Sequence, residues 1–318
     1  MKRKLEIVQF KKKHAPRAKE LAHESYIEEC GYVPSLTKHA EVPDPARYDN
    51  GLGVTAFHGG KMVGFLCCLT PFDNFFGTSK GTYVPVNAHA AVKEDRKRIY
   101  SRLYEAAADV WVREGILSHA IGVYSHDISA IESLFENGFG MRTIDAIRTM
   151  EEVDIKPLKG IGYRELQKEE YKEINPMRNR LISHLNSSPM FMPHRQVNEE
   201  NFLKEISNSP RRYFVADLND GIIAYIKITE EGESFIGDQD CMANIQGAYM
   251  NEEYRGSGIY TNLLAYVIRQ LRAEGYTHIG VDCESFNPTA RGFWLKYFTP
   301  YIYGLTRRID ERIAVFYK

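Results

Sequence analysis

The sequence predicts an α/β (α+β) protein built from two tandem copies of one unit, each a mixed, mostly antiparallel sheet flanked by helices. Three observations support this prediction. The chain has 318 residues, which suggests two domains at roughly 150 residues per domain. The two halves match each other at a constant offset of 160 residues. Each half also follows the same order of hairpin, strand, tight turn and long amphipathic helix.

The internal repeat is visible both in identical residues and in equivalent patterns. Ile99-Tyr100 matches Ile259-Tyr260. Segments 54–66 and 214–226 each consist of two strand-like runs joined by turn residues. In the second segment the turn is Asn219-Asp220-Gly221, which is a strong signal for a β-hairpin. The constant offset argues for two copies of one unit more strongly than the sparse identities do.

Proline and glycine residues between the copies place a boundary there, so we expect an N-terminal domain at 1–152 and a C-terminal domain at 162–318. The elements expected in the C-terminal copy are, in order, a strand at 162–166, helical segments, the hairpin, a strand ending near 250, a helix carrying an apolar stripe from Leu263 to Leu271, a strand at 279–283, a helix at 289–297 and a last strand near 309–316.

Composition excludes several functional classes. Lys and Arg together number 41 and Asp and Glu 42, so we expect neither a nucleic-acid partner nor an acidic membrane surface. The longest apolar run, 63–69, is too short to span a bilayer, and no apolar segment follows the basic residues 1–4. The five cysteines lack metal-ligand spacing and favour reduced thiols, so we expect a cytoplasmic protein without a metal site.

The segment most informative about chemistry is a glycine-rich turn, Arg255-Gly256-Ser257-Gly258, between a strand and the long helix. Glycines let the backbone turn sharply and leave its amides uncovered. The first amides of a helix have no internal partner, and their partial positive charge favours a phosphate. Arg255 can add a charge-assisted contact. The turn has neither P-loop nor Rossmann spacing, and by itself it indicates no more than a helix start.

With its context included, the sequence resembles the GNAT superfamily of N-acetyltransferases. That family carries Arg/Gln-x-x-Gly-x-Gly/Ala between a strand and a helix, and Arg255 and Gly258 match this motif. About 30 residues later the family has Asn-x-x-Ala and an aromatic pair, which match 287–290 and Phe293-Trp294. The resemblance covers most of the second copy and, at the level of pattern, the first copy.

The resemblance implies an acetyl-CoA-dependent enzyme in which an amine, from a small molecule or a peptide, attacks the thioester directly. The pyrophosphate would lie on the loop amides, and the pantetheine arm would follow the preceding strand where it separates from its neighbour, often at a bulge. The residues that the resemblance assigns to the cofactor are Ala248, Tyr249, Met250, Arg255, Gly256, Ser257, Gly258, Ile259, Tyr260, Thr261 and Asn287.

Two departures from the family pattern stand out. Tyr260 occupies the second small position of the motif, where its ring either points away from the pyrophosphate or crowds it. Trp294 stands where the family often has a general-acid tyrosine, and an indole cannot donate a proton at useful acidity. Neighbouring tyrosines that could replace it are Tyr297, Tyr301 and Tyr303.

The general base is open at this point. Glu284 follows the strand expected to line the cleft and is the first candidate, although a solvated loop carboxylate is the simpler interpretation. Asp240 and Glu252 are alternatives. The acceptor cleft is expected to include segment 186–194, in which three hydrophobic residues, 190–192, form either an apolar lid or an ordinary loop. His184 and His194 are interpreted as surface or packing residues.

The first copy is expected to keep the fold but not the cofactor. Its loop is Asp95-Arg96-Lys97-Arg98, without glycine, which indicates a solvated basic helix start. Asp127 replaces Asn287, and a carboxylate there would repel an anionic cofactor. We expect this copy to act as a built-in dimer partner, so that the protein is a monomer with an internal pseudo-dimer or a homodimer. Alternatives to catalysis are a non-catalytic acyl-CoA-binding protein and a nucleotide-phosphate protein using the same loop.

Overall fold

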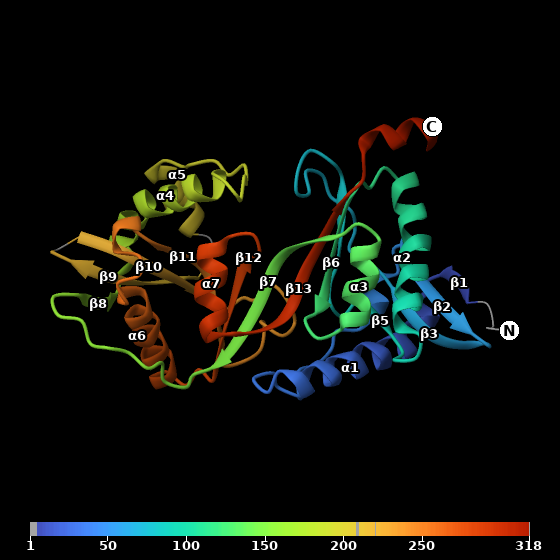
Figure 1. The fold of residues 1–318 in the computed structure, drawn as a ribbon, viewed down its shortest axis with the longest axis horizontal. Helices are drawn as coiled ribbons and strands as arrows, with labels where there is room; N and C mark the ends of the chain where they lie inside the picture. Colours follow the sequence, from blue (N-terminus) through green and yellow to red (C-terminus); the bar gives the residue numbers. More distant parts are fainter. Residues whose placement is uncertain (1–4, 208–209, 220, 318) are drawn as a thin grey trace. The chain divides into compact units, whose positions relative to one another are not determined.

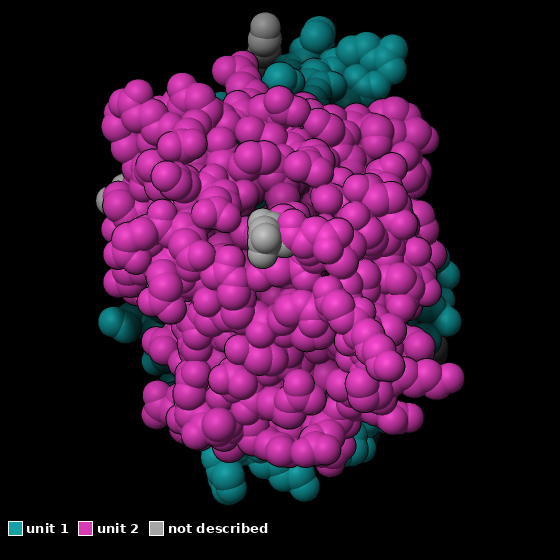
Figure 2. Space-filling model, turned by 90° about the vertical axis from the view of Figure 1, so that its left-hand side faces the viewer, with its two compact units in different colours: residues 1–145, 300–318 teal, residues 146–299 magenta. Residues whose placement is uncertain are grey.

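The structure, a computed structural model, describes residues 5–207, 210–219 and 221–317. The basic residues 1–4 and Asp220 of the expected hairpin turn lie outside these ranges. The chain forms two compact units, residues 1–145 with 300–318 and residues 146–299 (Figure 2). The sequence-based bounds assign 300–318 to the C-terminal domain. In the structure this segment groups with the first unit, because β13 (Thr299–Arg308) pairs antiparallel with β6 (Ser118–Tyr124).

The first unit combines an antiparallel sheet with a parallel strand pair. Strands β1, β2, β3 and β5 form the antiparallel sheet in that order, and β4 pairs parallel with β6. Helix α1 packs on β5 and β3, while α2 packs on β2 and β3. The remaining elements are β1 (Glu6–Gln9), α1 (Ala15–Tyr32), β2 (Val54–His58), β3 (Lys61–Leu66), β4 (Gly81–Val84), β5 (His89–Ala91), α2 (Arg96–Arg113), α3 (Ile128–Glu136) and β7 (Gly140–Thr149), which ends in the second unit.

The second unit holds the strand order β8-β9-β10-β11-β12, antiparallel except for the parallel pair β11–β12. Helices α4 and α5 lie on one face of this sheet and α6 on the other (Figure 1). The expected mixed, mostly antiparallel sheet flanked by helices is therefore confirmed. The elements are β8 (Gly162–Glu165), α4 (Ile174–Asn186), α5 (Glu199–Ser207), β9 (Arg212–Leu218), β10 (Gly221–Thr229), β11 (Met242–Met250), α6 (Ile259–Ala273), β12 (His278–Glu284) and α7 (Pro288–Tyr297).

The 160-residue repeat recurs in the element bounds. Strands β6 and β12 begin at residues 118 and 278 and end at 124 and 284. Helices α2 and α6 both end before a Glu-Gly pair, and Gly115 and Gly275 have positive φ angles of 71° and 97°. An L side chain rarely adopts this conformation, so glycine ends both helices. The Glu-Gly signal in the sequence therefore marks the helix ends correctly.

The strand expected at 309–316 is wrong. The last strand, β13, occupies residues 299–308, and a 3₁₀ helix follows at Glu311–Tyr317. Asp310 starts this turn, because its carboxylate accepts a hydrogen bond of 3.0 Å from the backbone N–H of Arg312. Asp is a common turn former for this reason. The apolar residues that suggested a strand instead belong to the 3₁₀ helix.

Strands β11 and β12 separate in the middle of the second unit. Their pairing runs from Met242 opposite His278 to Ile245 opposite Val281 and then stops. On its other side β11 stays paired with β10 as far as Met250, with a register shift that leaves Gln246 as a bulge. A bulge bends its strand, so residues 247–250 pair with β10 alone. This separation is the feature that the family resemblance implies.

Two further properties concern the whole described chain. None of its helices is both long and apolar enough to cross a membrane. The five cysteines are free thiols, four of them buried and Cys241 exposed. The expectation that the cysteines pack as buried residues therefore holds for all but Cys241.

Candidate functional site

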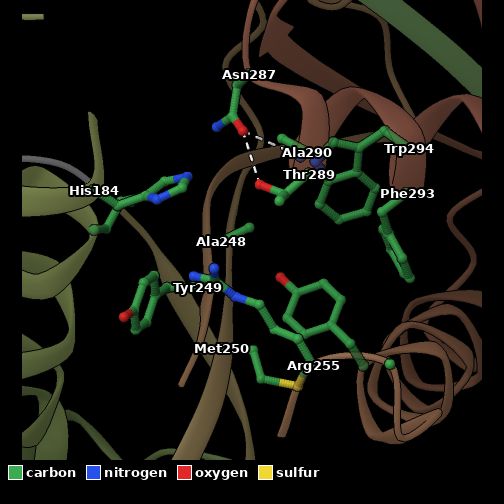
Figure 3. A pocket seen from close by; sticks show the side chains of 13 residues that line it. His184, Ala248, Tyr249, Met250, Arg255, Asn287, Thr289, Ala290, Phe293 and Trp294 are labelled. Atoms are coloured by element: carbon green, nitrogen blue, oxygen red, sulfur yellow. Dashed lines mark hydrogen bonds between the residues drawn. The ribbon is translucent and has the colours of Figure 1, made fainter. Parts of the chain in front are cut away.

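A cavity of about 300 Å³ opens in the second unit beside the part of β11 that has left β12 (Figure 3). This volume is at the lower end of the range of small-molecule pockets. Its walls come from α4, β11, the glycine-rich loop, the first turn of α6 and the start of α7. The lining residues are Leu181, His184, Ala248, Tyr249, Met250, Arg255, Gly256, Tyr260, Asn287, Thr289, Ala290, Phe293 and Trp294. Most of the cofactor residues expected from the sequence therefore come together here.

The remaining expected residues, 257–259 and 261, form the loop and first turn of α6 beside the cavity. Gly256 and Gly258 have φ angles of 79° and 84°, and a Cβ built on either would meet nothing within 4 Å. Among the described residues, the amides of Gly256, Gly258 and Tyr260 donate no backbone hydrogen bond. Uncovered amides at a helix start attract an anion. The loop thus has both the donors and the open space that a phosphate needs.

Tyr260 lines the cavity without covering the loop. Its hydroxyl donates a hydrogen bond of 3.1 Å to the backbone carbonyl of Tyr225 in β10. Its ring packs edge-to-face on Phe293, with 5.0 Å between the ring centroids. Burial holds the pKa of the Tyr260 phenol well above its usual value, so the ring is neutral. The bulky residue at this motif position is therefore directed toward the sheet and not toward the loop amides.

Asn287 caps α7 and faces the cavity. Its Oδ1 accepts hydrogen bonds from the Thr289 hydroxyl at 2.8 Å and from the Ala290 amide at 3.3 Å. In Figure 3 its side-chain nitrogen points away from these partners, toward the side of the cavity where His184 lies. An amide held in this way has its N–H donors available to a ligand. The cap and the ligand contact can therefore coexist in one residue.

The tyrosines considered as general acids are placed elsewhere. The Tyr297 hydroxyl lies 3.1 Å from the Thr261 hydroxyl and bonds to it at the start of α6. Tyr301 and Tyr303 lie on β13 in the first unit. Trp294 is buried and lines the cavity. The structure thus offers no replacement for the family tyrosine among these three residues.

Asp282, which sequence reasoning missed, is the most strongly perturbed carboxyl group near the point where the strands separate. It follows Val281, the last β12 residue paired with β11. Burial, together with the negative charges of Glu233 and Glu284, raises its pKa to about 7, and Lys227 opposes this shift. A carboxyl that titrates near neutrality suits proton transfer. No local sequence signal marks Asp282, because its pKa depends on residues from other elements.

Neither Asp282 nor the carboxylates named from the sequence line the cavity. Glu284 ends β12, two residues beyond Asp282. Glu252 forms an exposed ion pair of 3.3 Å with Arg255, and Asp240 lies exposed before β11. Arg255 also lies over the Tyr249 ring, 5.7 Å from its centroid. The general-base role of Glu284 stays a prediction.

Comparison with known proteins identifies the second unit. Residues 179–298 match the family described as the Acetyltransferase (GNAT) family. This segment belongs to the GNAT family. No curated protein sequence matches the chain.

Solved structures extend the likeness in fold over nearly the whole chain. A GCN5-related N-acetyltransferase from Sphaerobacter thermophilus is 13% identical, with a TM-score of 0.60, and 96% of each chain is covered. A glucosamine N-acetyltransferase region of a fungal multi-domain β-N-acetylglucosaminidase is 14% identical, with a TM-score of 0.53, covering 96% of this chain and 38% of the other. These similarities show the fold alone.

One histidine that was interpreted from the sequence as a surface or packing residue lies in the site. His184, on α4, lines the cavity, and Figure 3 shows its imidazole directed across the cavity toward Asn287. Of the two alternatives for residues 190–192, the apolar lid is not formed over this cavity: Met190 and Met192 are buried, Phe191 is 69% exposed, and none of the three lines the cavity. The segment therefore fits the alternative of a loop anchored by hydrophobic residues.

In the first unit, the position of the GNAT loop is filled by an internal ion cluster. The Arg96 side chain is buried and pairs with Glu28 at 2.9 Å and with Asp127 at 3.3 Å. The prediction of a solvated basic helix start is therefore wrong for Arg96. Lys97 and Arg98 are ion-paired as well, with Glu132 and Asp95. Cations that are already neutralised attract a phosphate weakly.

In the first unit, two short strands, β4 and β5, take the place of β11. The side chain of His89, on β5, lies against β6. Residues 81–84 pair with β6, whereas 89–91 pair with β3. The buried His89 lies 2.7 Å from the Gly122 carbonyl through Nε2 and 2.8 Å from the Tyr100 hydroxyl through Nδ1. A neutral ring satisfies both contacts when Nε2 donates and Nδ1 accepts. The space between the separated strands is thus occupied by protein atoms.

Proposed function

We propose that the GNAT domain of the second unit binds acetyl-CoA and transfers its acetyl group to an amine. One observation carries this proposal: the uncovered amides of the glycine-rich loop adjoin a cavity beside strand β11, where β11 has lost its pairing with β12. A pyrophosphate needs the first feature and an extended pantetheine arm needs the second.

The cofactor would lie along three consecutive parts of the site. Its pyrophosphate would accept hydrogen bonds from the uncovered amides of Gly256, Gly258 and Tyr260, with Arg255 adding charge. Its arm would follow residues 248–250, which pair with β10 alone and so have unpaired backbone groups toward the cavity. Asn287 would donate to the arm from the start of α7. A backbone N–H at this gap would polarise the thioester carbonyl.

The chemistry requires a neutral amine. Its nitrogen attacks the thioester carbon, the C–N bond forms, the C–S bond breaks, and the amine proton passes to a base. We assign the base to Asp282, because it comes directly after the last residue of β12 that pairs with β11, where the two strands separate, and because its pKa of about 7 allows it to accept a proton near neutral pH. The departing thiolate takes a proton from another group or from water, because Trp294 cannot supply one.

The test joins cofactor binding to turnover. Calorimetry should show binding of CoA and acetyl-CoA by the protein, with ATP and NAD bound much more weakly. Incubation with acetyl-CoA and a mixed panel of amines should release free thiol above the rate of spontaneous hydrolysis. Binding of ATP or NAD as tight as that of CoA would contradict the proposed cofactor.

A second candidate function is a non-catalytic acyl-CoA-binding protein. Trp294 favours it, because this residue lines the cavity where the family often places its acid. This candidate predicts tight CoA binding without turnover on any amine. The thiol-release assay therefore separates the two functions.

A further inference from the structure

A second cavity, of about 340 Å³, lies next to the first in the same unit. Both cavities are lined by Leu181 of α4. Along β11, Gln246 and Gly247 line the second cavity and Ala248 begins the first. A strand advances roughly 3.3 Å per residue, so a molecule of a few bonds can reach from one cavity into the other. The second cavity lies away from the glycine-rich loop, beyond the expected thiol end of the cofactor.

The second cavity is strongly cationic. Among the residues that the structure describes, four positively charged side chains and one carboxylate, that of Glu205, line it. The four cations come from α4, β10 and the segments before α5 and β9. Positive charges that line one concave site raise the local concentration of anions. The four cationic residues are Arg178, Arg195, Arg211 and Lys227.

The one carboxylate does not neutralise this group. Glu205 binds a single nitrogen of Arg178, Nη2, with contacts of 3.0 and 3.1 Å. The other terminal nitrogen, Nη1, is buried and has no hydrogen-bond partner among the described residues. Leaving a buried charged donor unsatisfied is energetically unfavourable, because the group has lost its hydrogen bonds to water. An anionic ligand would remove this cost.

Two of the four cations, the exposed Arg195 and the half-buried Lys227, have no carboxylate partner at ion-pair distance among the described residues. Burial, followed by the charge of Arg211, lowers the pKa of Lys227, while the carboxylates of Asp282 and Glu205 oppose this shift. The cavity is therefore arranged for a negatively charged group and not for a second cation.

We propose that the acceptor is an amine bearing an anionic group, such as the carboxylate of an amino acid, and that this group binds in the cationic cavity while the amine points toward Ala248. This inference rests on the proposed acetyl transfer. It names a substrate class, anionic amines, of which a carboxylate and a phosphate ester are the two forms that a test must distinguish.

The experiment compares amines with and without the charge. Amino acids and their carboxamides form one set of pairs, and phosphoethanolamine with ethanolamine forms another. Wild-type protein with saturating acetyl-CoA should use the anionic member of at least one set with a kcat/KM at least about tenfold higher. The set showing this preference identifies carboxylate or phosphate as the recognised group.

Variants that change the charge of Arg195 test whether the preference for anionic amines arises in the second cavity. Arg195→Glu should lower kcat/KM for the preferred anionic amine at least about tenfold, leave the uncharged partner within about twofold, and leave CoA affinity unchanged. Arg195→Lys should retain most of the preference. The matched control is Arg269→Glu on α6, exposed and outside both cavities, which should change nothing.

The experiment distinguishes failure of the anionic-acceptor inference from failure of the proposed acetyl transfer. Equal use of charged and uncharged amines, or an equal loss for both in Arg195→Glu, overturns the anionic acceptor and leaves the acetyltransferase intact. CoA binding without turnover of any amine overturns the proposed function itself. Weaker CoA binding by Arg195→Glu would assign the cationic cavity to the cofactor and overturn the inference.

Discussion

The hydroxyl of Tyr260 donates a hydrogen bond of 3.1 Å to the backbone carbonyl of Tyr225. This contact joins the first turn of α6 to β10 and directs the ring away from the loop amides. In the first unit the equivalent residue, Tyr100, instead bonds to His89 at 2.8 Å. Tyr260 and Tyr100 occupy the same position in the repeat. Tyr260 lines an open cavity in the second unit, whereas Tyr100 and His89 occupy the corresponding space in the first unit.

Tyr260→Phe should leave the cofactor site intact. The variant loses one hydrogen bond, so its free energy of unfolding should fall by about 1 kcal/mol, while CoA affinity stays within about threefold. Urea unfolding and calorimetry measure the two quantities. Tyr266→Phe on the same helix is the control, since its hydroxyl has no hydrogen-bond partner among the described residues. A large loss of CoA affinity in Tyr260→Phe would show that the hydroxyl itself contacts the cofactor.

Gly258→Val should weaken CoA binding at least about tenfold, or roughly 1.4 kcal/mol. A side chain there enters the open space beside the amides, and its φ of 84° disfavours an L residue. Gly275→Val is the matched control, because Gly275 has a φ of 97°, open surroundings and a place at the other end of the same helix.

The control variant should share the backbone strain but keep its CoA affinity. Arg98→Val in the first unit should likewise leave affinity unaltered. Calorimetry of the three folded variants makes the comparison, and equal losses in Gly258→Val and Gly275→Val would show that strain alone explains the effect.

Asp282 should give the reaction its dependence on pH. If this carboxylate is the base, kcat/KM rises as pH increases through about 7, where the group loses its proton. Asp282→Asn should abolish this rise and lower the rate about 10²-fold or more. Glu284→Gln should keep the rise but move it to lower pH, because the charge of Glu284 contributes to the raised pKa of Asp282. A pH–rate profile that persists in Asp282→Asn and disappears in Glu284→Gln would return the role to Glu284.

The same residue should affect stability. The pKa of Asp282 is higher in the folded protein, about 7, than the ordinary 3.8 of an unfolded chain. Between these values the folded state binds more protons, so its free energy of unfolding decreases as pH rises through this window and is level above it. In Asp282→Asn this decrease should be absent. Urea unfolding at pH 5 and pH 8 measures the difference.

One CoA molecule should bind per chain. The first unit places Arg96 in an ion cluster with Glu28 and Asp127 and His89 between its separated strands. Calorimetry should therefore give a stoichiometry of one, and two molecules per chain would contradict the assignment of a filled first unit.

His89→Ala should cost roughly 2–4 kcal/mol of stability, since it leaves buried polar groups unpaired. The exposed His58→Ala is its control and should cost little.

The sequence by itself determined the features that depend on neighbouring residues. The repeat offset, the hairpins, the helix end at Gly275 and the glycine-rich turn at 255–258 are all encoded in short stretches. Backbone conformation responds to local residue type, because φ preference, capping and side-chain periodicity act over a few residues. For that reason the fold class and the loop were predictable.

Only the tertiary structure decided which groups share an environment. The direction of the Tyr260 ring depends on a carbonyl in β10, and the pKa of Asp282 depends on Glu233 and Lys227 from other segments. The four cationic residues of the second cavity come from separate segments between residues 178 and 227. Electrostatic interaction and burial act through space and not along the sequence. The cofactor loop could therefore be predicted from the amino-acid sequence, whereas the proposed general base and the positive charge of the proposed acceptor site could not.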